Sequence, residues 1–72
     1  MDTDAIKNLL QNAFPDAEIA VDFEGSHLHL QVISDTFTGL SPVKRQQKIY
    51  AVLNEKIASG EIHAVNMVLS TP

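Results

Sequence analysis

Three histidines are the residues of this chain best suited to chemistry. His27 and His29 open one apolar segment, and His63 opens the segment 61–69 at a position where a strand usually prefers a β-branched or aromatic residue. Neutral imidazole is a common ligand for transition metals, and histidine can exchange a proton near neutral pH. The chain has no cysteine, so its own residues can form neither a disulfide nor a thiolate metal site. We therefore look first to the imidazoles for metal binding.

The length and composition place these histidines in a small domain. The chain has 72 residues, of which 44% are hydrophobic and 19% are charged, as in ordinary globular domains. A chain of this size buries only about 60% of its unfolded surface, which leaves no room for an elaborate active-site cavity. No segment approaches the roughly 20 apolar residues of a membrane span, and the first residues do not resemble a signal peptide. We expect one cytoplasmic domain, residues 1–72, that is monomeric on its own and does not bind membranes.

The charge distribution combines an acidic body with one basic patch. The net charge is −4, whereas proteins that bind nucleic acid usually show a basic face. Lys44, Arg45 and Lys48 nevertheless lie within five positions of one another. Such a patch is most often a solvated helix face. It can also contact phosphates or the acidic side of a partner.

The first half of the chain predicts a helix and a β-hairpin. Apolar residues recur at helical spacing up to Pro15-Asp16, and Asp2 or Thr3 can cap this helix. These apolar residues are Ile6, Leu9, Leu10 and Phe14. Residues 18–23 and 27–32 then alternate between apolar and polar, and the short turn 24–26 between them requires an antiparallel pair. In the second strand Leu28, Leu30 and Val32 share one face, and His27, His29 and Gln31 share the other.

The second half predicts a crossover unit. Ser41-Pro42 is a typical helix start, and the helix should run to about Ala58, before Gly60. Its expected apolar stripe is Val43, Ile49, Tyr50, Leu53 and Ile57. A last strand covers residues 61–69, and a strand, helix and strand in succession make the two strands parallel. We predict an α+β fold, a three-stranded mixed sheet with the helices on one face.

This topology predicts that two histidines lie together. Parallel strands begin at the same edge of a sheet, so His27 and His63 should lie at one end of the domain. From the residues alone, His63 is more often a hydrogen-bonded strand-end histidine than a ligand. His27 could equally cap the turn after Gly25, and His29 could simply be exposed to solvent.

The chain resembles the BolA family over nearly its whole length. Residues 37–50 are similar to the F-x-G-x-S-x-x-x-R signature of that family, and Ile62-His63-Ala64 is similar to its I/V-H-A motif. Gly25-Ser26-His27 resembles the motif that opens the second strand in many members. Gln46 stands where many members carry a histidine. The resemblance implies a fold like the class II KH domain, with the order αββαβ.

The resemblance also implies a partner and a shared cofactor. BolA-like proteins pair with monothiol glutaredoxins, and the pair can share a [2Fe-2S] cluster whose sulfur ligands come from glutaredoxin and glutathione. The BolA side supplies the histidine of the I-H-A motif, here His63, and a loop histidine or cysteine. Residues 22–26 hold neither type, so His27 is the nearest substitute and His29 the next. The implied role is iron–sulfur trafficking or iron homeostasis.

Two other functions remain open, and catalysis is not expected. A KH-like transcription regulator would bind DNA or RNA weakly through Lys44, Arg45 and Lys48, although the chain lacks the GXXG loop of KH domains. A docking module would use the I-H-A segment without metal. Arg45 matches the arginine of the signature, and it could instead tie the helix start to the preceding loop. The chain contains no P-loop, dinucleotide fingerprint or recognisable Ser-His-Asp context, so we do not expect an enzyme.

Overall fold

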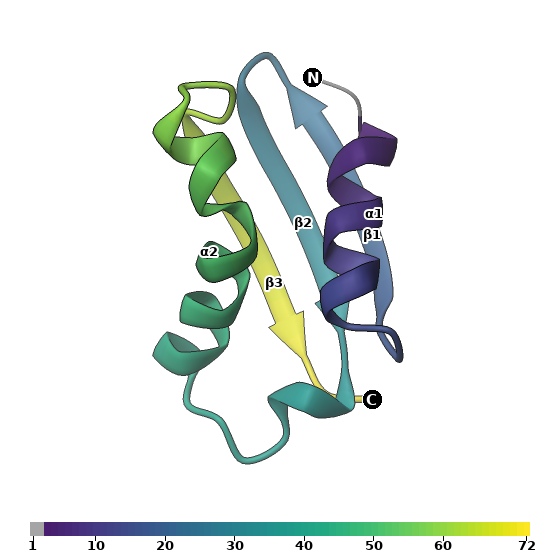
Figure 1. Cartoon of the computed structure of the whole chain (residues 1–72). Helices are drawn as coiled ribbons and strands as arrows, with labels where there is room; N and C mark the ends of the chain where they lie inside the picture. Colours follow the sequence, from purple (N-terminus) through teal and green to yellow (C-terminus); the bar gives the residue numbers. More distant parts are fainter. Residues whose placement is uncertain (1–2) are drawn as a thin grey trace.

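The computed structural model describes residues 3–72. Its elements are α1 (Thr3–Ala13), β1 (Glu18–Glu24), β2 (His27–Ile33), the short 3-10 helix η1 (Asp35–Phe37), α2 (Pro42–Ala58) and β3 (Ala64–Ser70). Both helices lie on the same face of one three-stranded sheet (Figure 1). The predicted order αββαβ and the α+β fold are therefore confirmed. Neither helix of the described residues is long and apolar enough to cross a membrane.

The sheet has the predicted topology. Its order is β1-β2-β3, with β1 antiparallel to β2 and β2 parallel to β3. The alternation along β2 separates the two faces as expected. Leu28, Leu30 and Val32 are buried against the helices, whereas His27, His29 and Gln31 are exposed or half-buried on the outer face. The outer face therefore carries two of the three histidines.

The core lies between this sheet and the two helices. Its buried apolar residues are Ile6, Leu10, Phe14, Ala17, Ile19, Leu28, Leu30, Val32, Phe37, Ile49, Leu53 and Ile62. Phe37 is fully buried, and its ring centroid lies 5.7 Å from that of Phe14. Gly39 then takes a φ of 79°, a left-handed conformation that favours glycine, and leads the chain into α2.

The predicted apolar stripe of α2 was partly wrong. Val43 and Tyr50 are 62% and 43% exposed, whereas Ile49 and Leu53 are fully buried. Each helical residue turns by about 100°, so Tyr50 points well away from the direction of Ile49. The half-buried residues on the sheet side include Arg45, which the hydrophobic pattern had not placed there. Hydrophobicity alone therefore placed Ile49, Leu53 and Ile57 correctly on the core side, and Val43 and Tyr50 wrongly.

Two predicted boundaries also changed. The last strand begins at Ala64 rather than at residue 61, so His63 precedes β3 instead of opening it. The chain needs residues 59–62 to return from α2: Gly60 has a φ of 84°, and the Ile62 N–H donates to the Lys56 carbonyl over 3.3 Å. Thr3 is the first residue of α1 rather than its cap, and Asp2 lies outside the described residues.

Candidate functional site

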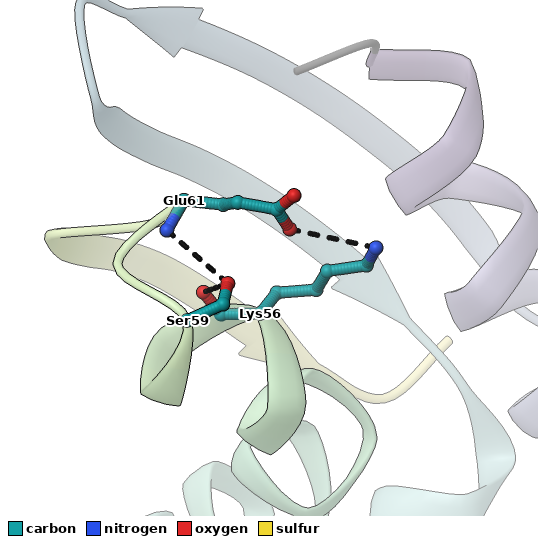
Figure 2. Close-up of polar contacts among 3 residues, drawn as sticks. All are labelled: Lys56, Ser59 and Glu61. Carbon is teal, nitrogen blue, oxygen red and sulfur yellow. Dashed lines mark hydrogen bonds and ion pairs between the residues drawn. The ribbon is translucent and has the colours of Figure 1, made fainter.

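A polar network holds the loop that precedes His63. The Ser59 hydroxyl donates to the Lys56 carbonyl over 3.0 Å and accepts the Glu61 N–H over 3.4 Å. The Glu61 carboxylate returns to the Lys56 ammonium at 3.5 Å, which closes the loop on the end of α2 (Figure 2). Exposed contacts of this kind are individually weak, but together they restrict the backbone between α2 and β3.

The backbone of His63 is held on both sides. Ile62, the preceding residue, is 1% exposed and anchors the loop in the core. The His63 N–H donates to the Ser26 carbonyl over 3.1 Å, which joins the loop to the turn between β1 and β2. The His63 side chain is exposed and has no hydrogen bond or ion pair within residues 3–72. The backbone of His63 is therefore fixed, while its imidazole is exposed and has no hydrogen-bond partner among the described residues.

His27 lies next to His63 at the same end of the sheet. The parallel register pairs His27 with Ala64. The residues that precede the two strands, Ser26 and His63, are joined by the hydrogen bond from the His63 N–H to the Ser26 carbonyl. From the strand spacing and the rise per residue, the Cα atoms of the two histidines lie roughly 6 Å apart. The expectation that they share one end of the domain is confirmed. The His27 side chain is exposed, and no hydrogen bond among the described residues supports the alternative that it caps the turn.

His29 differs from the other two histidines. Its Nε2 lies 3.5 Å from a Glu24 carboxylate oxygen, and its Nδ1 lies 3.4 Å from the side-chain nitrogen of Asn66. If Asn66 donates to Nδ1, the ring proton sits on Nε2 and faces Glu24. The expectation of a simply solvent-exposed His29 is therefore wrong. Binding a metal at His29 would break one of these contacts, which leaves His27 as the less encumbered second ligand.

The basic patch lies at the opposite end of the domain from His63. Lys44 and Arg45 stand near the start of α2, whereas His63 follows its end (Figure 1). The 14 steps along the helix from Lys44 to Ala58 span about 21 Å. A single small ligand cannot contact both groups. The sequence-predicted site residues therefore form two separate surfaces.

Arg45 has a structural function at the start of α2. Its Nε donates to the Leu40 carbonyl over 3.0 Å, and one terminal nitrogen donates to the Leu69 carbonyl over 3.4 Å. The guanidinium thus joins the loop before α2 to the end of β3. Lys44 and Lys48 remain exposed.

Replacing Arg45 with alanine is expected to lower the free energy of unfolding by about 2 kcal/mol, because two carbonyl groups lose a charged donor. Arg45→Lys should recover only part of this loss, since an ammonium cannot reproduce the two directions of the guanidinium. Urea denaturation measures both values. Lys44→Ala is the matched surface control, with a change within about 0.5 kcal/mol. Equal losses for Arg45→Ala and Lys44→Ala would contradict this function of Arg45.

The local ligand set is small. Within residues 3–72, no group of three or more His, Cys, Asp or Glu side chains is placed to hold a metal ion. A metal bound through His63 or His27 would therefore need ligands from another molecule. Sequence reasoning named Ser26 and Ile62 only as parts of family motifs and missed that they position His63; it missed Asn66, which contacts His29, altogether. The available signal for Asn66 was a polar residue inside the apolar segment 64–69.

Comparisons with known proteins agree with this architecture. Residues 5–72 match the family model described as BolA-like protein. The chain is 45% identical over 67 residues to an uncharacterized protein of Acinetobacter guillouiae from the rpoN-murA intergenic region, covering 93% of this chain and 81% of that protein. It is 39% identical over 72 residues to the acid stress protein IbaG of Escherichia coli K12, which covers 100% of this chain and 86% of that protein. The solved BolA domain of SufE1 from Arabidopsis thaliana superposes with a TM-score of 0.86 at 32% identity. The match covers 97% of this chain and 91% of that domain. The chain therefore belongs to the BolA-like protein family.

Proposed function

We propose that this protein is a partner of a monothiol glutaredoxin and supplies His63 and His27 to a shared [2Fe-2S] cluster. The observation that carries the proposal is the exposed His63 imidazole, which has no partner within residues 3–72 and stands on a backbone held by Ser26 and Ile62. Membership of the BolA-like family supports it. The role would be iron–sulfur trafficking or iron homeostasis.

The chemistry of the donor set fits such a cluster. Histidine can replace cysteine at one iron of a [2Fe-2S] centre, as in Rieske proteins. The chain has no cysteine, so the sulfur ligands would come from glutaredoxin and from glutathione. His63 directly precedes β3 and lies beside the start of β2, where His27 stands, and neither ring must give up a hydrogen bond within the described residues. The cluster would supply the iron and sulfide that are passed on.

The proposed ligands also make binding sensitive to acid. An imidazole ligates iron only when it is deprotonated, so protons compete with the metal for His63 and His27. Binding through these two residues should weaken as the pH falls. A labile attachment of this kind suits transfer of a cluster better than permanent storage.

The proposal predicts that His63→Ala abolishes the mixed-complex spectrum. The protein, a monothiol glutaredoxin, glutathione, iron and sulfide are combined without oxygen, and visible absorption and circular dichroism are recorded. With the unaltered protein, the spectrum should differ from that of the glutaredoxin cluster alone. It should revert to that spectrum in His63→Ala and weaken in His27→Ala. His29→Ala is the matched control and should leave the spectrum unchanged, because Glu24 and Asn66 already engage that ring.

Two outcomes would contradict the proposal. An unchanged mixed spectrum in His63→Ala would mean that the imidazole is not a ligand. A glutaredoxin complex that survives His63→Ala and forms equally well without iron would favour the metal-free docking module. Isothermal titration of the two proteins with and without iron distinguishes these cases.

The nucleic-acid alternative stays a prediction with less support. Arg45 uses its guanidinium on two carbonyl groups of the same domain, which leaves Lys44 and Lys48 as the exposed cations of the patch. A net charge of −4 and the absence of a GXXG loop also disfavour it. No observation favours DNA or RNA over a protein partner.

A further inference from the structure

A shallow groove runs along the outward face of the first half of α2. It has a volume of about 410 Å³ and is lined by Leu40, Lys44, Gln47, Lys48 and Ala51. Leu40 and Ala51 supply apolar surface, and the two lysines stand one helical turn apart beside it. The groove therefore combines an apolar surface with two positive charges.

The positions of these lysines do not serve the stability of the helix. Like charges four residues apart repel each other on a helix surface. The first turn of a helix also favours acidic residues, yet the first turn of α2 contains none and Lys44 lies there instead. Within residues 3–72 no carboxylate forms an ion pair with Lys44 or Lys48. Both charges would be stabilised by carboxylates from another molecule.

Two large apolar side chains of α2 are exposed beside the groove. Val43 and Tyr50 are 62% and 43% exposed, and helical geometry places both on the Gln47 side of the groove. Exposed apolar residues that gather beside charges are typical of protein-interaction surfaces. Glu55, one turn beyond Ala51 on the same face, would repel an acidic ligand and limits the surface to the first half of α2.

We propose that this groove docks an acidic segment of a protein partner. Carboxylates of the segment would pair with Lys44 and Lys48, and an apolar side chain would pack on Leu40 and Ala51. A nucleic acid fits this surface less well, because two free cations on a chain of net charge −4 give little phosphate attraction and no groove residue except Gln47 offers an uncharged polar contact.

This surface is independent of the histidine end. About 21 Å of helix separates Lys44 from the end of α2, and about 10 Å separates Ala51 from it, so no residue of the groove belongs to the histidine end. The inference therefore goes beyond the proposed cluster function and does not rest on it.

The test uses a fluorescein-labelled synthetic peptide in which glutamate and leucine recur at helical spacing, without glutaredoxin or iron. Anisotropy should report binding that weakens with salt, and amide shifts should change at Leu40, Lys44, Gln47, Lys48 and Ala51. Lys44→Gln/Lys48→Gln should weaken binding by about tenfold or more. Lys7→Gln/Lys56→Gln removes the same charge elsewhere and should change it by less than about twofold. Ala51→Glu should also abolish binding, because it places a carboxylate and extra volume in the groove.

Several results would overturn the inference. One is that the peptide does not bind. Another is that the two double variants lose peptide affinity equally. A third is that the shifted amides are confined to the region of His27 and His63. A peptide with serine in place of leucine that binds equally well would show that the apolar surface contributes nothing. A single-stranded oligonucleotide of equal charge that binds more tightly through the same amides would assign the surface to nucleic acid. None of these results bears on the spectrum of the mixed cluster.

Discussion

Replacing Phe37 with alanine is expected to lower the free energy of unfolding by about 3–5 kcal/mol. Phe37 is fully buried, and its ring contacts that of Phe14 at 5.7 Å between centroids. The substitution leaves a cavity and removes an aromatic pair that contributes about 0.5–1.5 kcal/mol beyond the buried area. A domain of this size has a total stability of roughly 4–11 kcal/mol, so the loss is a large part of it.

Chemical denaturation followed by circular dichroism measures this loss. Phe37→Leu keeps much of the buried volume and should cost clearly less than Phe37→Ala. A double-mutant cycle with Phe14→Leu isolates the ring contact, because the two side chains touch. A loss below about 1 kcal/mol for Phe37→Ala would contradict the packing described here.

Local signals explain why most of the fold could be predicted from the sequence. The alternation of residues 27–32 determines which side of β2 is buried, and no distant contact is needed to see it. Ser41 does cap α2, since its hydroxyl accepts the Lys44 N–H over 3.3 Å, and Pro42 is the first helical residue. Strand pairing then follows from connection lengths, because a short turn requires antiparallel strands and a helical crossover allows parallel ones.

The errors occurred where tertiary contacts override local preference. Tyr50 has an apolar ring at a plausible helical spacing, but the sheet contacts the face formed by Ile49 and Leu53 instead. Fully buried Ser34 was not foreseen either. Its hydroxyl donates to the Asp16 carboxylate over 3.0 Å and accepts the Thr36 N–H over 3.1 Å, so its burial depends on partners both near and far in the sequence.

In the candidate site, too, local features could be predicted from the sequence, whereas features that depend on tertiary contacts could not. Its strongest signal, Ile62-His63-Ala64, is local and came from the family resemblance. The nearness of His27 follows from topology alone. The contacts of His29 with Glu24 and Asn66 could not be predicted, because they depend on the register of three strands. The separation of the lysines from the histidines also requires the direction of α2.

Replacing Ile62 with alanine is expected to lower the free energy of unfolding by about 2–5 kcal/mol and to loosen His63 at the same time. Ile62 is 1% exposed and is the last core residue before β3. The His63 N–H should exchange with solvent faster in Ile62→Ala, because its bond to the Ser26 carbonyl depends on this anchor. Ile62→Val is the matched control, with a loss of about 0.5–1.5 kcal/mol and little change in exchange.

Ile62→Ala also distinguishes the two sets of contacts that hold His63: the core packing of Ile62 and the polar contacts of the loop 59–61. If Ile62 positions His63, Ile62→Ala should weaken the mixed-cluster spectrum under conditions where the domain is still folded, although the imidazole itself is unchanged. If the exchange of the His63 N–H stays as slow as in the unaltered protein, the contacts among Lys56, Ser59 and Glu61 must hold the loop without the core anchor. Lys56→Gln would then be the variant that loosens it. Because Ile62 has no polar atom beyond its backbone, an effect of Ile62→Ala on the spectrum would reflect the placement of His63 and not the loss of a ligand.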